Sequence, residues 1–125
     1  MESYLLETIQ EELKDKRYQA WEWTKPFEYP YIVGEYFENS HSFETYFTHG
    51  RFILSVIHRG KMREILPLID ELKYHFSDFR VSRINDDGKA EMVYITFEYG
   101  LRQLTNEMEL IRYELNFNFL YSRGD

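Results

Sequence analysis

The chain opens with apolar positions spaced as in a helix. Leu5, Ile9 and Leu13 recur at intervals of four, Leu6 widens the stripe, and charged residues fill most positions between them. Ser3 stands where a helix N-cap is expected. The pattern predicts a helix over residues 3–16.

An extended segment follows this helix. Residues 17–30, "RYQAWEWTKPFEYP", combine two tryptophans and two prolines with alternating polarity, which is typical of extended chain. Pro30 cannot donate a ladder hydrogen bond, so it suits the first position of a strand. We predict a strand over 31–38 and a polar connection over 38–44, "ENSHSFE".

A longer strand is predicted over 45–58. Apolar residues fall on both of its faces, with one set on even positions and one on odd positions: Phe52, Leu54 and Val56, then Ile53 and Ile57. A strand that is apolar on both faces belongs at the centre of a sheet. Gly60 ends it.

Helical spacing returns over 61–76, "KMREILPLIDELKYHF", in which the apolar positions are Met62, Ile65, Leu66, Ile69, Leu72 and Phe76. Pro67 disturbs this pattern, because an interior proline loses a backbone hydrogen bond and clashes with the preceding turn. A helix that begins near Glu64 places Pro67 in its first turn, where no bond is lost. Otherwise the helix kinks at Pro67.

Three strands complete the pattern. "FRVSRI" and "EMVYITFEY" flank the turn "NDDGKA", and Asp87-Gly88 between two such runs indicates a hairpin. One face of the second run is predicted to carry Val93, Ile95, Phe97 and Tyr99. A polar connection over 100–107, "GLRQLTNE", then leads to a last strand with apolar period-two positions Ile111, Tyr113, Leu115, Phe117, Phe119 and Tyr121.

These elements predict the fold class. The order is helix, two strands, helix, three strands, with short hairpin links that favour antiparallel pairing. We therefore predict a single α+β domain over 1–125, a mainly antiparallel sheet of about five strands with two helices on one face.

Composition and charge narrow the function classes. The net charge is −7 without any Lys/Arg-rich run, so the positive footprint of a nucleic-acid-binding protein is absent. The chain has no cysteine, which excludes disulfides and thiolate sites. The N-terminus is too acidic for a signal peptide, and no apolar run approaches the roughly 20 residues that span a bilayer. We expect a soluble, cytoplasmic protein.

The aromatic content is high, at 18%, with 11 tyrosines and 10 phenylalanines. Tyrosine has an apolar body and a polar tip, so it suits half-buried faces and protein interfaces. A β-rich core uses the same residues, and we favour that interpretation over the interface.

Residues that could bind metals or catalyse a reaction are scattered. His49 and His58 are an odd number of positions apart, so on one strand they point to opposite faces, while His41 lies in a polar loop and His75 at a helix end. Asp86 and Asp87 precede a glycine and indicate a turn. Without a glycine-rich phosphate loop or a nucleophile elbow, we expect no enzyme activity, no cofactor and no metal site.

Two charged clusters have a functional and a plain interpretation. Arg59, Lys61 and Arg63 precede the second helix, where a phosphate could bind exposed amides, although a solvated turn is the simpler interpretation. The second cluster is acidic and consists of Glu107, Glu109 and Glu114. These residues could be paired carboxylates for acid–base chemistry, but no apolar residues surround them to raise a carboxyl pKa. We therefore interpret them as solubilising.

The whole order of elements resembles the tail terminator (tail completion) proteins of long-tailed bacteriophages and prophages. The resemblance covers roughly 3–121 and comprises the N-terminal helix, the strand start "YPYIVGE" (29–35), the long strand leading into "HRGKMREILPLIDELKYHF", and the long last strand. Only "YPYIVGE" is close in letters, and the length of the 100–107 connection departs from the family.

The resemblance implies a structural virion protein without catalytic activity. Such proteins close into a ring, usually a hexamer, on the last ring of the tail tube, stop its growth and offer a surface to the head-completion or connector protein. The expected location is the virion tail, or the host cytoplasm during assembly. DNA passes through the ring, and a negative chain suits such a lumen because it does not bind the duplex.

A candidate subunit interface follows from the aromatic residues near the first strand, Tyr36, Phe37, Trp21 and Trp23. We expect positions 29, 31 and 33 to fill the core, and Ile32 and Tyr36 to take the opposite face, toward a partner. The alternative function is a small-ligand or peptide-binding domain that uses the exposed aromatics Trp21, Trp23 and Tyr36.

Overall fold

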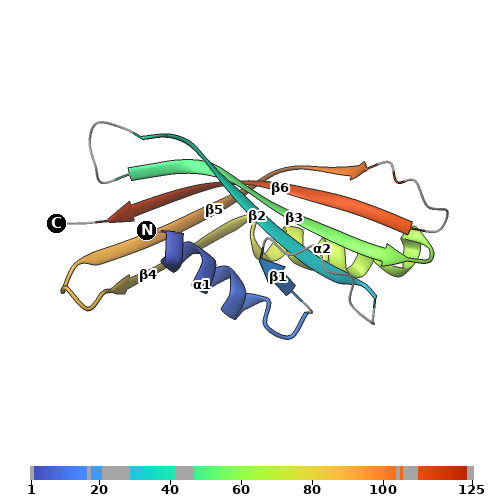
Figure 1. Cartoon of the computed structure of the whole chain (residues 1–125), viewed down its shortest axis with the longest axis horizontal. Helices are drawn as coiled ribbons and strands as arrows, with labels where there is room; N and C mark the ends of the chain where they lie inside the picture. The colour runs from blue at the N-terminus through green and yellow to red at the C-terminus, as the bar shows by residue number, and fades with distance from the viewer. Residues whose placement is uncertain are drawn as a thin grey trace.

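A computed structural model describes residues 2–16, 18–20, 29–41, 47–103, 105 and 110–123 of the chain. Its elements, in order, are α1 Glu2–Glu12, β1 Tyr18–Ala20, β2 Tyr31–His41, β3 Phe47–Arg59, a short 3-10 helix Met62–Glu64, α2 Leu66–His75, β4 Asp78–Ile84, β5 Ala90–Gln103 and β6 Leu110–Arg123 (Figure 1). The fold is α+β, as the spacing of apolar positions predicted.

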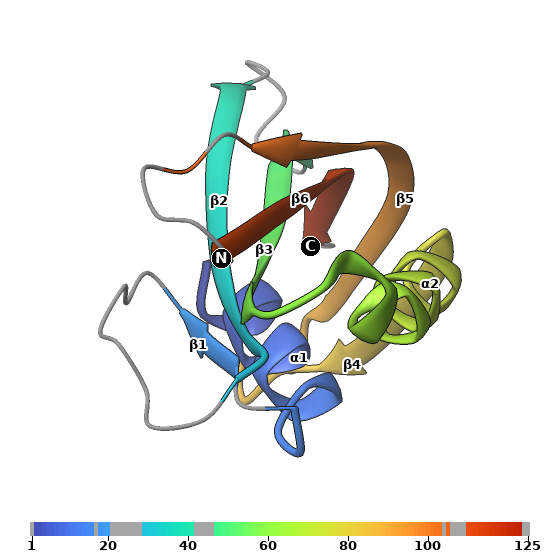
Figure 2. The same ribbon diagram turned by 90° about the vertical axis from the view of Figure 1, so that its right-hand side faces the viewer.

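The strands form one curled sheet in the order β1-β2-β3-β6-β5-β4 (Figure 2). The five long strands pair antiparallel, and the short β1 adds to β2 in parallel. β3 lies between β2 and β6, so its predicted central place is confirmed. The sequence had predicted extended chain around β1 but not its pairing.

Both helices cover the same face of the sheet. The helices and the residues that directly follow them contribute to the main core Tyr4, Leu5, Ile9, Leu13, Ile69, Leu72 and Phe76. Their sheet partners include Ile32, Phe52, Leu54, Val56, Val93, Ile95, Ile111, Leu115, Phe117, Phe119 and Tyr121. The side chains of β3 and β6 reach this core at every second position, which confirms their predicted alternation.

Pro67 lies in the first turn of α2, so the first of the two alternatives for this helix is correct. The 3-10 helix precedes α2, and the first regular helical bond runs from the Ile69 amide to the Ile65 carbonyl (2.9 Å). The proline therefore removes no helical hydrogen bond.

The β4–β5 hairpin forms at the predicted turn. Gly88 has a φ of +76°, a left-handed conformation that glycine adopts without strain. The side-chain oxygen of Asn85 accepts hydrogen bonds from the backbone amides of Asp87 and Lys89, both at 3.0 Å. Asn85 thus holds the turn from its first position.

Two predicted polar connections begin later than expected. β2 continues to His41 and β5 continues to Gln103, so 38–41 and 100–103 are strand; residues 42–44, 104, 106 and 107 lie outside the described residues. The physical reason is that backbone pairing with β3 and β6 continues where side chains turn polar.

A β-bulge in β5 corrects one predicted face. Phe97 pairs with Phe117, but Tyr99 pairs with Asn116, so the register shifts by one residue at Glu98. Val93, Ile95 and Phe97 stay on the helix-covered face, whereas Tyr99 turns to the opposite one. Strict alternation cannot predict this reversal, because an inserted residue exchanges the two faces.

Candidate functional site

The structure reverses the expected faces of β2. Ile32 is fully buried in the main core, and the Tyr36 ring packs edge-on against Phe119 with centroids 6.2 Å apart. Tyr31 and Val33 point to the other face, where they are also buried, in a small second cluster with Ile57. The alternation was right, but the side covered by the helices was assigned wrongly. Trp21, Trp23 and Phe27 lie outside the described residues.

The helix-free face of the sheet carries exposed apolar side chains. Phe37 on β2 is 45% exposed, and Tyr99 and Leu101 on β5 are 43% and 50% exposed. The ladder places all three on the face opposite the helices, because their lateral partners are Arg51, Asn116 and Glu114. We call these three residues the helix-free patch.

Polar side chains lie beside the patch in the middle of the sheet. Glu114 accepts hydrogen bonds from Gln103 Nε2 and Arg112 Nη2, both at 2.9 Å. Glu114 therefore belongs to a half-buried ion pair and is not the freely solvated carboxylate that we expected; Glu107 and Glu109 lie outside the described residues. The Ser55 hydroxyl is fully buried and has no hydrogen-bond partner among the described residues.

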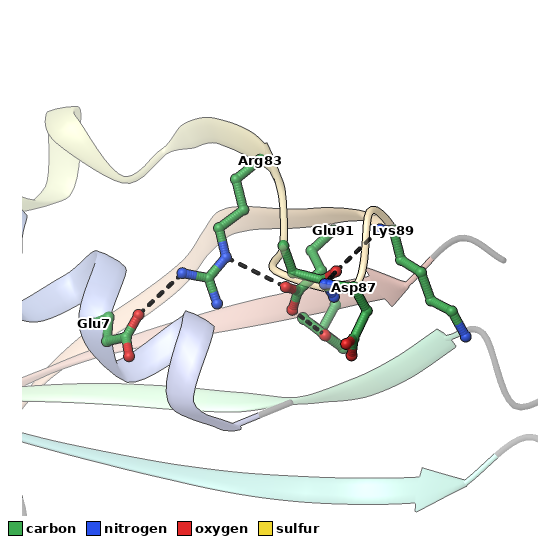
Figure 3. A network of polar contacts seen from close by, with 7 residues as sticks. Glu7, Arg83, Asp87, Lys89 and Glu91 are labelled. Atoms are coloured by element: carbon green, nitrogen blue, oxygen red, sulfur yellow. Dashed lines mark hydrogen bonds and ion pairs between the residues drawn. The ribbon is translucent and has the colours of Figure 1, made fainter.

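A second polar cluster connects α1 to three strands at the end of the sheet that holds the β4–β5 turn (Figure 3). Arg83 donates from Nη1 to Glu7 Oε2 (3.1 Å) and from Nε to Glu91 Oε1 (3.3 Å). Its guanidinium also lies 4.1 Å from the centroid of the Tyr4 ring. The Tyr121 hydroxyl donates to the other Glu91 oxygen.

Glu91 is the buried charge of this cluster, and it is compensated. Burial alone would raise the pKa of its carboxyl, but the hydrogen bond from Tyr121, the positive charge of Arg83 and the hydrogen bond with Asn85 together lower that pKa. A buried carboxylate with these partners is a structural element that anchors α1.

A cleft of about 330 Å³ opens beside this cluster, between α1 and β4, and is lined by Tyr4, Glu7, Thr8, Glu11, Glu12, Val81 and Arg83. Its carboxylates already have cationic or histidine neighbours. Glu11 pairs with Lys14 at 2.8 Å, and Glu12 lies 3.3 Å from His75 Nε2. Each of these carboxylates thus has a basic side chain nearby, and Arg83 is shared between Glu7 and Glu91.

His49 and His58 point to opposite faces of β3, as predicted, whereas His41 ends β2 and does not lie in a polar loop. His49 and His58 lie opposite Leu120 and Ile111 on β6, which places them on opposite faces of the sheet. His58 Nε2 lies 3.4 Å from Glu64 Oε1. Within the described residues, no three potential metal ligands come together.

The basic cluster before α2 already has an internal anion. The Glu64 carboxylate accepts the backbone amide hydrogen of Lys61, at the position where a bound phosphate was the functional interpretation. Arg59 lies over the Tyr29 ring, 5.8 Å from its centroid. Lys61 and Arg63 are exposed. This arrangement agrees with the simpler interpretation of a solvated turn.

The comparisons with known proteins add no assignment. None of the described helices is long and apolar enough to cross a membrane. The helix-free patch places Phe37 on β2 and the other two residues on β5, with β3 and β6 between them. No protein-family model and no curated protein matches this chain.

Proposed function

We propose that this chain is a structural protein of a long-tailed bacteriophage or prophage that caps the tail tube as a ring. The ring stops tail elongation and provides the surface for head–tail joining. The observation that carries the proposal is the helix-free patch, three large apolar side chains on a sheet face that neither helix covers. Exposed aromatic and aliphatic groups on a face of this kind are typical of protein interfaces.

The sequence resemblance supplies the identity of the partners. In that family the chain pairs with copies of itself, usually as a hexamer, and contacts the major tail tube protein and a head-completion protein. The fold suits such a role, because long antiparallel strands give a rigid surface. The net charge of −7 is compatible with DNA passing through the ring without binding.

Electron microscopy of tails assembled with and without the protein tests the proposal. Wild-type protein should give tails of uniform length, and its absence should give tails of uncontrolled length. Phe37→Asp should reproduce the absence, because it places a charge in the helix-free patch. Tyr74→Asp is the matched control, since Tyr74 is 85% exposed on α2 and lies outside the patch.

The outcomes separate this function from the alternative. Uniform tails without the protein, or with Phe37→Asp in a folded state, would contradict the ring proposal. A stable monomer that does not bind tail tubes, and whose tryptophan fluorescence changes when a small ligand or peptide is added, would favour a binding domain. Tyr36, which that alternative used, packs against the main core.

A further inference from the structure

The second half of β5 forms an open edge of the sheet. β4 pairs with β5 only from Ala90 to Thr96. From Phe97 to Gln103, β5 pairs with β6 on one side, and no described strand pairs with its other side. This half runs along the upper right of Figure 1, where no strand lies beyond it. Unpaired strand edges with apolar side chains are sites of pairing with another strand.

The sequence of this edge is self-complementary. We infer that two copies of the chain pair antiparallel through "FEYGLRQ" (97–103), with Gly100 opposite Gly100 of the second copy. In this register Glu98 faces Arg102 and Tyr99 faces Leu101, each pair occurring twice. Opposite charges and aromatic–aliphatic pairs are the cross-strand neighbours that stabilise sheets.

The side chains lie on the faces that this pairing requires. Tyr99 and Leu101 share the helix-free face, because their partners on β6 are Asn116 and Glu114. Arg102 lies on the helix-covered side, opposite Tyr113, and alternation from Gly100 places Glu98 on that side too. A twofold axis perpendicular to the sheet keeps each pair on one face, so all four contacts form together.

The open stretch also has the right length and surroundings. The last residue of β5 that pairs with β4 is Thr96, opposite Asp78, so the open stretch begins at the next residue. The second half of another β5 fits between this point and Gln103. A cleft of about 280 Å³ borders it on the helix side, lined by Asp70, Lys73, Tyr74, Ser77 and Phe97. This cleft leaves room on that side for the Arg102 side chain of the second copy.

Gly100 fits the centre of the pair. A Cβ atom on Gly100 would lie 2.5 Å from the Tyr113 hydroxyl oxygen, because the Tyr113 ring covers this position. Gly100 is therefore needed for packing within one chain. For this reason Gly100 is left unchanged in the test.

The dimer does not rest on the proposed function. An isologous pair closes with two copies and does not build a ring about one axis. Pairing of two β5 strands covers Tyr99 and Leu101. If the ring uses the same side chains, the dimer must dissociate before its subunits join the ring. Measurements on the purified protein decide whether the dimer forms, and tail assembly decides the proposed function. Either hypothesis can therefore be wrong while the other is correct.

The test is a charge exchange followed by sedimentation velocity over a range of protein concentrations. Wild-type protein should dimerise. Glu98→Arg and Arg102→Glu each place like charges opposite one another twice, and each should raise the dimer dissociation constant by about tenfold or more. The double variant Glu98→Arg/Arg102→Glu restores both attractions and should return to within about threefold of wild type.

A control and the unfolding curves exclude other causes. Arg63→Glu makes the same charge change as Arg102→Glu at an exposed position of the 3-10 helix, and it should dimerise like wild type. Unfolding midpoints close to wild type show that each variant is folded. A wild type that stays monomeric, single variants that dimerise as well as wild type, or a double variant that stays as weak as the singles would each overturn the inference. The first result would make the bulge and the two charges a device that keeps this edge unpaired, and the second would place the dimer contact on another surface.

Discussion

Phe117 packs against three other aromatic rings in the core. It is fully buried on β6, and its ring centroid lies 6.1 Å from Phe52, 5.8 Å from Phe76 and 5.6 Å from Phe97. Phe117→Ala should lower the free energy of unfolding by about 3–5 kcal/mol, because it opens a cavity among these rings. Asn118→Ala, at the next and exposed position, should change it by less than about 0.5 kcal/mol. Urea unfolding measures both, and equal losses would contradict the alternation of β6.

Glu91 gives the second prediction at the scale of one residue, a pH dependence. The folded pKa of its carboxyl lies below the unfolded reference of 4.5, so its interactions stabilise the fold above that pH. This stability is lost as the pH falls through the folded pKa. Glu91→Gln should be less stable than wild type near pH 7 and should lose less stability between about pH 7 and about pH 3.

Urea unfolding across that pH range checks the Glu91 prediction. Tyr121→Phe should also weaken the dependence, because it removes the hydrogen bond to the carboxylate. A Glu91→Gln variant with the same pH slope as wild type would show that other carboxylates carry the acid sensitivity.

Single residues also show where sequence reasoning ends. The burial of Phe117 followed from period-two alternation alone. Asn116 has the same parity as the exposed Asn118, yet it is only 2% exposed. Its parity alone predicts a solvent-facing side chain, whose truncation would cost less than about 1 kcal/mol unless it lay in an interface. The burial of a polar residue depends on what covers the second face of the sheet, which alternation does not encode.

At the scale of one element, β2 has a testable division between its two faces. Tyr36 packs against Phe119 and the main core, whereas Phe37 is 45% exposed on the helix-free face. Tyr36→Ala should therefore lower the free energy of unfolding by about 2 kcal/mol, and Phe37→Ala by about 1 kcal/mol or less. Thermal and urea unfolding of the two variants give the comparison. If Phe37→Ala lowered the free energy of unfolding more than Tyr36→Ala, Tyr36 would again be a candidate for the subunit interface.

The elements differ in how well their patterns predicted them. Helical spacing was sufficient to predict that α2 exists, although it left two alternatives for Pro67, and Asp87-Gly88 was sufficient for the hairpin, because local chemistry determines both. The ends of β2 and β5 were predicted wrongly, since backbone pairing with a neighbouring strand extends them into polar sequence. The bulge at Glu98 is a tertiary feature in the same sense, because it becomes visible only once β5 is aligned with β6.

For the whole molecule, the sheet combines one covered face with one incompletely covered face. The helices bury the first face, and the second keeps a small apolar cluster, a half-buried ion pair and the helix-free patch. Sequence patterning predicted the number of layers, because amphipathic helices need a sheet face to cover. It identified Phe37 as a candidate interface residue but missed the other two residues of the patch, since Tyr99 reached it through the bulge and Leu101 through the unexpected extension of β5.

Hydrogen exchange can test the open edge within the whole molecule. Alternate amides of β5 between Phe97 and Gln103 point away from β6, and no described residue accepts their hydrogen bonds. They should exchange rapidly at low protein concentration and slowly once the dimer forms, because a second β5 would then accept them. Amides of the central β6 strand, such as those around Leu115, should be protected in both conditions. In Arg102→Glu the edge amides should remain fast at every concentration. Full protection of this edge in a monomer verified by sedimentation would mean that the chain itself covers it, and the pairing of two copies would have no site.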